Sequence, residues 1–570
     1  MWRNHHNVGL SLAALLLVSC AKSGVDDKVA ATSDSAEEAK AQSIVVTGTQ
    51  LPAPALARTA PMDMMTMAPP PPPPPPPPAP GMYVPQWASP PYHDQGRDKF
   101  THADENPFKI VREVPVSTFS IDVDTASYSW VRASLNRNVL PQPDSVRSEE
   151  LINYFRYDYA PPRTKEAPFS TNVAVMPSPW SPGRKLVRIG IKGYSVSRTT
   201  QPHANLVFLI DTSGSMQEPN KLPLVKQSLA MLLGELKPDD TVSIVTYAGY
   251  AGTALEPTPV RDKGKIEAVI DSLGAGGSTA GAEGIRQAYR LAEANLDPHG
   301  VNRVILATDG DFNVGITNQE ELKGYIERER EKGVFLSVLG FGMGNYNDAL
   351  MQTLAQNGNG AAAYIDTVNE ARKTPVEEAG GTLFPIAKDV KIQVEFNPAT
   401  VAEYRLIGYE TRALNRDDFD NDKVDAGDVG AGQTVTALYE IVPVGGPRTM
   451  GDLRYSAPAK VASSGSEYGY VKIRYKLPKS STSKLIATPI TRALEYRSFA
   501  AAPLDARFAA AVAGFAELLR GGKYAGSLSY DDVIHIASAA RGNDEFGYRS
   551  EFVQMVRAAK SARTLASLGE

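Results

Sequence analysis

Three oxygen-bearing side chains follow a run of apolar residues in the first half of the chain. Leu206 to Ile210 is uninterrupted, and Asp211, Ser213 and Ser215 come directly after it. An apolar run of about four to eight residues bounded by turn residues is typical of a strand buried on both faces. Polar sites in parallel sheets form at the carboxyl ends of strands. One carboxylate and two hydroxyls in a turn can converge on one point, and hard oxygen donors favour Mg²⁺ or Mn²⁺ over zinc.

The pattern Asp211-x-Ser213-x-Ser215 after an apolar strand resembles the metal-ion-dependent adhesion site (MIDAS) of von Willebrand factor type A domains. That family adds a threonine and a second aspartate from later loops. GAGGSTAG, residues 274–281, offers Thr279, and the strand-like RVILATDGD, residues 303–311, offers Asp309. The resemblance implies that both serines bind the metal directly, while Thr279, Asp211 and Asp309 bind it directly or through water. The alternative is that these residues only cap turns and hold no metal.

Length and composition limit the classes of protein to consider. A chain of 570 residues is too long for one core and predicts two to four domains. Hydrophobic residues make up 42% and charged residues 22%, as in globular proteins. A net charge of −5 argues against nucleic acid as the main partner. Because the chain has one cysteine, an intrachain disulfide is excluded.

The single cysteine, Cys20, closes a short leader. Residues 1–19 carry Arg3 and then an apolar core, Leu10 to Val18, which is too short to span a bilayer comfortably. Leu17-Val18-Ser19-Cys20 resembles the lipobox of bacterial lipoproteins, in which the leader is removed and the cysteine carries the lipid. Ala21 stands where an aspartate would imply inner-membrane retention, so the resemblance implies the outer membrane. An ordinary signal peptide is the alternative.

Residues 20–104 have the composition of a disordered tether. Small, polar and proline residues predominate, so little apolar surface is available to offset the entropy of ordering. The prolines at 69–78 predict a polyproline II rod of roughly 30 Å, which acts as a spacer or as a ligand for a proline-binding partner. Ile44 to Gly48 resembles a short segment of TonB-dependent receptors and suggests strand addition to a TonB-system or outer-membrane partner.

Residues 105–165 predict a small α/β unit. Phe119, Ile121 and Val123 alternate with polar residues, and helices are expected at Thr125 to Arg137 and Ser148 to Phe155. The segment resembles the amino-terminal region of YfbK-like lipoproteins, which carry a von Willebrand type A domain in mid-chain. Asp122-x-Asp124 also begins like a haloacid-dehalogenase phosphatase, but Ala126 stands at the fifth position. We expect these aspartates to face solvent or to cap the helix.

The remaining chain predicts an α/β fold class. Strands and helices alternate over 204–380, which indicates a doubly wound parallel sheet. Strands in 166–203 and in 381–487 are expected to form one β-sandwich-like domain into which the parallel-sheet domain is inserted. Residues 488–570 are expected to be helical and resemble the YfbK-like carboxy-terminal domain. Asp418, Asp420 and Asp422 are spaced like the start of an EF-hand, but Lys423 and Val429 depart from it, which leaves calcium a minor alternative.

Together these patterns predict a membrane-anchored envelope protein that binds a protein partner through the metal. An Asp or Glu of the partner is expected to complete the coordination. A non-catalytic scaffold with a structural metal is the alternative. An enzyme is not expected, because the seven histidines are scattered and the only cysteine is expected to be lipidated.

Overall fold

The computed structural model describes residues 100–163, 167–197, 200–277, 281–310, 319–343, 346–374, 384–451 and 465–569. Four predicted features lie outside these ranges: Cys20, the segment 44–48, the proline run and Thr279. Within the described ranges, no helix combines the length and the apolar character needed to cross a membrane.

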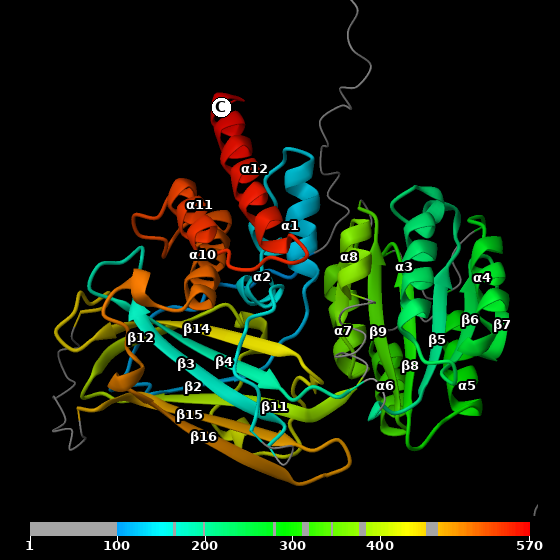
Figure 1. Cartoon of the computed structure of the whole chain (residues 1–570), viewed down its shortest axis with the longest axis horizontal. Coiled ribbons are helices and arrows are strands. Elements are labelled where there is room, and N and C mark those ends of the chain that lie inside the picture. Colours follow the sequence, from blue (N-terminus) through cyan, green and yellow to red (C-terminus); the bar gives the residue numbers. More distant parts are fainter. Residues whose placement is uncertain are drawn as a thin grey trace, which may run out of the picture. The chain divides into compact units, whose positions relative to one another are not determined.

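A six-stranded sheet forms the parallel-sheet domain, with the order β10-β9-β8-β5-β6-β7 (Figure 1). Five strands run parallel, as predicted, but β7 pairs antiparallel with β6. The sheet is therefore mixed rather than purely parallel, because the short turn Ala248 to Tyr250 returns the chain as a hairpin. Pro257 and Pro259 in β7 suit an edge strand, which needs fewer amide donors. The strands are β5 (Ala204–Asp211), β6 (Thr241–Tyr247), β7 (Ala251–Pro259), β8 (Val301–Thr308), β9 (Val334–Phe341) and β10 (Ala362–Ile365).

Helices cover both faces of this sheet, which explains why β5 reads as a continuous apolar run. Leu206 and Phe208 pack in one cluster with α3 (Leu222–Glu235) and α4 (Lys263–Ser272). Val207 and Leu209 face the opposite cluster. That cluster contains α5 (Gly281–Ala294), α6 (Gln319–Glu331) and α7 (Asp348–Asn357). The short α8 (Val368–Arg372) follows β10 and contributes Ala371 to the first cluster.

Two antiparallel sheets form the β-sandwich. Strands that precede the parallel-sheet domain pair with strands that follow it, because β4 lies between β3 and β14. The first sheet contains β1 (Lys109–Ile110), β12 (Val401–Ile407), β14 (Thr434–Pro443), β4 (Lys185–Gly193) and β3 (Phe169–Pro177). The second contains β13 (Val429–Gly430), β11 (Pro385–Phe396), β15 (Glu467–Lys476) and β16 (Ser483–Thr491), with β2 (Val116–Ser120) on the free side of β11.

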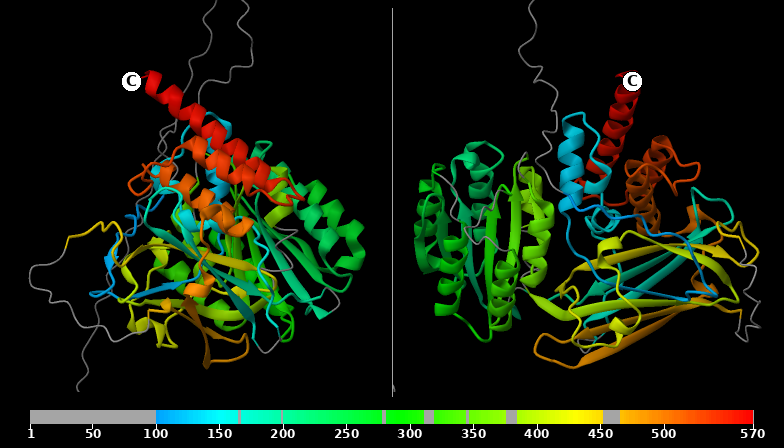
Figure 2. Two further views of the ribbon diagram at one scale, coloured as in Figure 1. Left: turned by 60° about the vertical axis from the view of Figure 1, so that its left-hand side comes forward. Right: turned by 180° about the vertical axis from the view of Figure 1, so that it is seen from behind.

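The outer face of the first sheet is covered by helices. Met176, Leu186 and Leu438 share a core with Phe508 and Phe515 of α10 (Leu504–Leu519). The same core takes in α11 (Tyr530–Ala539), α12 (Tyr548–Gly569), α1 (Ala126–Asn136) and α2 (Ser148–Asn153), and Figure 2 shows α1 in blue beside α12 in red. Residues 105–165 therefore do not build a core of their own: β1 and β2 join the sandwich, and α1 and α2 join the carboxy-terminal helices.

Candidate metal centre

The three residues that follow β5 lie at the carboxyl end of the central strand. Asp211 is the last residue of β5, and a tight turn of 3₁₀ helix, Gly214–Gln217, begins three residues later. The backbone amide of Ser213 donates to Oδ1 of Asp211 at 2.8 Å, which fixes the carboxylate toward the turn. The hydroxyls of Ser213 and Ser215 are 3.0 Å apart. Asp211 and Ser213 are buried, whereas Ser215 is exposed, so the group opens to solvent on one side.

Asp309 reaches the same edge of the sheet from β8. Because β8 runs parallel to β5 and pairs with it directly, the residues that follow the two strands become neighbours. Thr308, at the end of β8, donates from its hydroxyl to Oδ2 of Asp211 at 3.3 Å and accepts from the amide of Gly310 at 3.2 Å. Asp309 is 1% exposed. The structure thus brings Asp211, Ser213, Ser215 and Asp309 together.

The loop that leads toward Thr279 is attached to the same turn. The amide of Gly276 donates to the carbonyl of Thr212 at 2.8 Å, and the amide of Gly214 donates to the carbonyl of Gly277 at 3.1 Å. Gly277 has a φ of +90°, which favours glycine, and a Cβ there would lie in a tight contact 3.3 Å from the amide nitrogen of Gly249. Thr279 itself lies outside the described residues.

The four placed side chains fit a small, hard divalent cation. Two ligands in adjacent positions of an octahedral Mg²⁺ site, each at about 2.1 Å, stand about 3 Å apart. The two serine hydroxyls have this separation at 3.0 Å. Burial, with a smaller contribution from the charge of Asp309, raises the pKa of Asp211 to about 6 against the hydrogen bonds from Ser213. A partly desolvated carboxylate of this kind gains from a cation beside it. In the described ranges, no three His, Cys, Asp or Glu side chains gather as a metal site.

Lys221 also contacts this group of residues, which the sequence did not reveal. Its Nζ lies 3.1 Å from Oδ2 of Asp309 and 3.0 Å from the carbonyl oxygen of Ser215. Lys221 precedes the first residue of α3, so the helix start places it beside the turn. The only sequence signal was its position six residues after Ser215, which by itself says nothing about the direction of the side chain.

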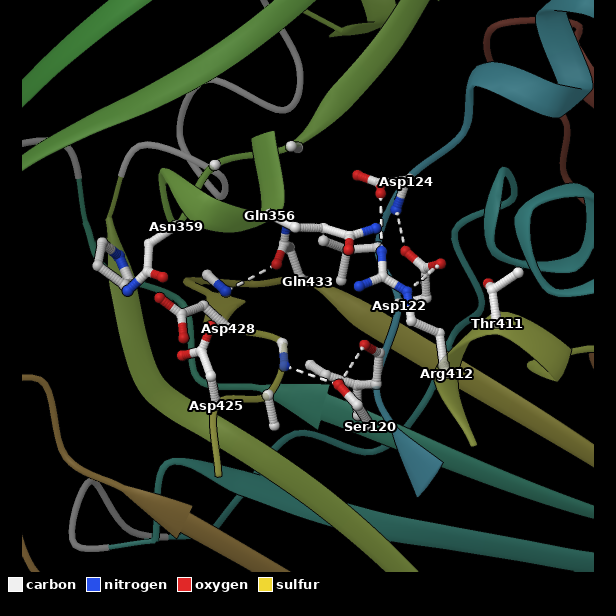
Figure 3. A pocket seen from close by; sticks show the side chains of 18 of the residues that line it. Ser120, Asp122, Asp124, Gln356, Asn359, Thr411, Arg412, Asp425, Asp428 and Gln433 are labelled. Atoms are coloured by element: carbon white, nitrogen blue, oxygen red, sulfur yellow. Dashed lines mark hydrogen bonds and ion pairs between the residues drawn. The ribbon is translucent and has the colours of Figure 1, made fainter. Parts of the chain in front are cut away.

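A second group of charged residues lines a cavity of about 220 Å³ where β2 is followed by α1 (Figure 3). Arg412 points between Asp122 and Asp124, and its guanidinium donates to each carboxylate at 2.9 Å. The expectation that these aspartates face solvent or cap the helix is wrong: they are 4% and 3% exposed. The second oxygen of Asp124 accepts the amide of Ala362, the first residue of β10, at 2.9 Å. The pair therefore ties three segments together, and its carboxylates are engaged rather than open for phosphatase chemistry.

The acidic loop on the other side of this cavity does not form a calcium site. The three aspartates spaced like an EF-hand start are engaged by groups of the protein: Asp418 accepts the amide of Asn415 at 2.9 Å, while Asp420 and Asp422 both pair with Arg474, at 3.2 and 3.4 Å. Farther along the loop, Asp425 pairs with Arg330 at 3.0 Å. Asp420, Asp422 and Asp425 therefore pair with cations of the protein, and the loop links β15 of the sandwich to α6 of the parallel-sheet domain.

Comparisons with known proteins agree with this architecture. The family model described as von Willebrand factor type A domain matches residues 205–376, one described as von Willebrand factor matches 94–188, and one described as Uncharacterized protein YfbK, C-terminal, matches 381–562. The chain is 43% identical over 472 residues to uncharacterized protein YfbK of Escherichia coli (strain K12), which covers 81% of each chain.

Solved structures to which the chain is similar include von Willebrand factor type A from Catenulispora acidiphila. It is 16% identical and covers 71% of this chain and 91% of that chain, with a TM-score of 0.37. Another is proximal thread matrix protein 1 from the mussel byssus with a zinc-occupied MIDAS motif. It is 23% identical and covers 32% of this chain and 46% of that chain, with a TM-score of 0.27. The expected α/β class and family resemblance are confirmed, and the chain belongs to the YfbK family, with a von Willebrand factor type A domain in its middle part.

Proposed function

We propose that the chain binds a protein partner through a divalent metal held at the carboxyl end of β5. The observation that carries this proposal is the convergence of one buried carboxylate and two hydroxyls 3.0 Å apart, beside Asp309, on an edge that is open at Ser215. Asp211, Ser213, Ser215 and Asp309 are the residues that would hold Mg²⁺ or Mn²⁺, together with Thr279. Bound there, the ion supplies a positive charge that can accept an Asp or Glu of the partner as its last ligand.

The ligand chemistry favours binding of an outside carboxylate. Two neutral hydroxyls leave more positive charge on the ion than two further carboxylates would, so an incoming anion is attracted more strongly. The backbone amide of Ser213 and the hydroxyl of Thr308 hold the two oxygens of Asp211 in place. The protein side of the site is thus preorganised, which reduces the ordering cost of binding.

The same geometry disfavours catalysis. Activation of water would need a general base beside the ion. The histidines next to these two strands are His203, which precedes β5, and His299, which precedes β8. Both stand at the amino ends of strands whose carboxyl ends carry Asp211 and Asp309. We therefore assign binding rather than turnover to this edge.

An exposed aromatic residue extends the proposed surface. Tyr250, in the turn between β6 and β7, is 80% exposed. The adjacent Gly249 lies near Gly277, since a Cβ at Gly277 would be 3.3 Å from its amide nitrogen, and the carbonyl of Gly277 accepts the amide of Gly214 in the metal-site turn. Exposed tyrosines are frequent anchors in protein interfaces. We assign Tyr250 to the rim that the partner contacts around its carboxylate.

We further propose that a lipid on Cys20 anchors the chain to the outer membrane and that residues 20–104 tether the folded part. The segment 44–48 would add a strand to a TonB-system or outer-membrane partner. Replacement of Cys20 by serine should move the protein from the membrane fraction to the soluble fraction, whereas unchanged fractionation would contradict the anchor.

The test of metal-dependent binding uses the full chain in detergent as bait in envelope extract. Three baits are compared: wild type in Mg²⁺, wild type in EDTA, and Asp211→Ala in Mg²⁺. Isothermal titration with Mg²⁺ should show binding by wild type and at least a hundredfold weaker binding by Asp211→Ala, because a charged ligand is lost. The exposed Asp239→Ala is the matched control and should bind like wild type.

A protein that only wild type recovers in Mg²⁺ supports the proposal, and Tyr250→Ala should then lose part of that recovery while its Mg²⁺ affinity is unchanged. Equal recovery by all three baits would instead favour a non-catalytic envelope scaffold whose metal is structural.

A further inference from the structure

A buried ammonium group lies at the edge of the proposed metal site. The side chain of Lys221 is 5% exposed, and that of Asp309, which it contacts at 3.1 Å, is 1% exposed. Ser215, one of the proposed ligands, provides its carbonyl oxygen to the same Nζ at 3.0 Å. Glu218 also faces Nζ, at 3.8 Å, but its side chain is 62% exposed, so solvent screens that interaction.

A glycine beside Lys221 leaves room for the lysine side chain. Gly342 follows β9 with a φ of +73°, and a Cβ there would lie 2.3 Å from Cε of Lys221. Any larger residue at position 342 would therefore displace the aliphatic stem that carries the ammonium to Asp309. A lysine held along its length in this way keeps its charge in place, in contrast to the mobile lysines of a protein surface.

We propose that Lys221 is a counter-ion built into the metal site, which neutralises Asp309 without metal and sets the affinity for the divalent ion. This inference rests on the proposed function, since it concerns the same site. Asp211 and Asp309 carry two negative charges and Lys221 one positive charge, so the described side chains sum to −1 rather than −2. Repulsion between the ammonium and a divalent cation opposes loading, and solvent screens this repulsion only weakly on the side of Lys221 and Asp309, which are both buried.

The consequence is a site that loads only at high concentrations of the ion. Without the ammonium of Lys221, the carboxylate of Asp309 would attract the cation more strongly, and the site would be filled at a lower concentration of the ion. The lysine also stabilises the metal-free fold, because a buried carboxylate without a cation is costly. At ion concentrations that fill the site only in part, the metal and the partner would thus bind together.

Isothermal titration of the full chain with Mg²⁺ and with Mn²⁺ tests the inference directly. Lys221→Met keeps the apolar stem and removes the charge, and we expect its dissociation constant to be at least about tenfold lower than that of wild type. Lys221→Gln, which retains a donor, serves if the methionine variant does not fold, and the same shift is expected. Lys226→Met is the matched control: Lys226 lies on the same helix but donates to the carbonyl of Asp271, and no change is expected.

Thermal unfolding gives a second readout that does not depend on titration heats. In EDTA, Lys221→Met should unfold at a lower temperature than wild type, and saturating Mg²⁺ should raise its unfolding temperature by more than it raises that of wild type. A merely structural lysine would lower the unfolding temperature equally with and without Mg²⁺.

The possible outcomes separate this inference from the proposed function. Binding by wild type with equal or weaker binding by Lys221→Met overturns the counter-ion role and leaves the metal site intact. No binding by wild type but binding by the variant supports the counter-ion role and refutes metal loading in the native protein. An absence of binding by both proteins overturns both.

Discussion

Arg412 shows how much a single residue contributes where three segments meet. Its guanidinium holds Asp122 and Asp124, both almost fully buried, and Asp124 also accepts the amide at the start of β10. Two carboxylates so close together are tolerated because one bidentate cation compensates them. The Asp-x-Asp pattern, which suggests chemistry in the sequence, therefore has a structural role: it connects the end of β2 to β10 and to the segment that follows β12.

Replacement of Arg412 by alanine should destabilise the fold strongly. Two buried carboxylates would lose their cation, and breaking such a pair costs about 3–5 kcal/mol. Urea denaturation followed by circular dichroism measures the change. The surface pair of Arg261 with Asp239, at 2.8 Å and more than half exposed on both sides, provides the control, and Arg261→Ala should cost less than about 0.5 kcal/mol. Similar losses of unfolding free energy for the two variants would contradict this structural role of Arg412.

Asp428, in the wall of the same cavity, should make stability depend on pH. Burial, with the charges of Asp389 and Asp425, raises its pKa to about 7. Because this folded-state pKa lies above that of an unfolded aspartate, the protonated group favours the fold at low pH, and this contribution is lost as the pH rises through 7. Between pH 5 and pH 8, wild type should lose about 2–3 kcal/mol more unfolding free energy than Asp428→Asn. Parallel pH profiles of the two proteins would refute this assignment.

At the scale of elements, α1 connects parts that are far apart in the sequence. Trp130 stacks on Tyr346 at 5.6 Å in the type A domain. Arg132 of the same helix is 1% exposed and pairs with three carboxylates. These belong to Asp366, to Glu370 of α8 at 2.7 Å and to Glu551 of α12 at 2.9 Å. The helix thereby fixes the end of the type A domain to the carboxy-terminal helices.

Arg132→Met should uncouple these elements. The variant leaves Asp366 and Glu370 buried without their shared cation, so we expect a loss of about 3–5 kcal/mol. Hydrogen exchange should rise in α1, α8 and α12 together, because all three share the contact. Arg290→Met, on the exposed face of α5, is the control and should change neither quantity. Faster exchange in α1 alone would show that the helix does not couple its neighbours.

At the scale of the whole molecule, the type A domain is an insertion in the β-sandwich. The two points where the chain leaves and re-enters the sandwich are adjacent, since a Cβ at Gly193 in β4 would lie 2.8 Å from Ile386 in β11. Adjacent ends are the condition under which a domain can be inserted without disrupting its host. The helices α10, α11 and α12 then cover the outer face of the first sheet.

Removal of residues 504–569 should expose that face. Met176, Leu186 and Leu438, buried beneath the helices, would lie in water, and an apolar sheet face of this kind promotes aggregation. We expect insoluble protein on expression, measured by the soluble fraction. A shorter deletion of 565–569 begins at Leu565, which is 59% exposed, and should stay soluble. A soluble, cooperatively unfolding product of the long deletion would show that the sandwich needs no cover.

The sequence by itself determined the features that depend on local spacing. The predicted helices Thr125 to Arg137 and Ser148 to Phe155 match α1 and α2 to within two residues, and the apolar run Leu206 to Ile210 lies within β5. The position of Asp211, Ser213 and Ser215 at a strand end also followed from the apolar run before them. These predictions hold because alternation and helical periodicity involve residues only two to four positions apart.

Only the tertiary structure decided which distant side chains meet. Lys221 and Asp309 are 88 positions apart, and Arg412 and Asp122 are 290 apart. No local pattern encodes such pairs, since they depend on which strands become neighbours and on the crossings between them. The antiparallel β7 was missed for a related reason: its prolines and polar residues suit an edge, and an edge exists only once the sheet is assembled. Local spacing thus specifies the elements, and packing specifies their partners.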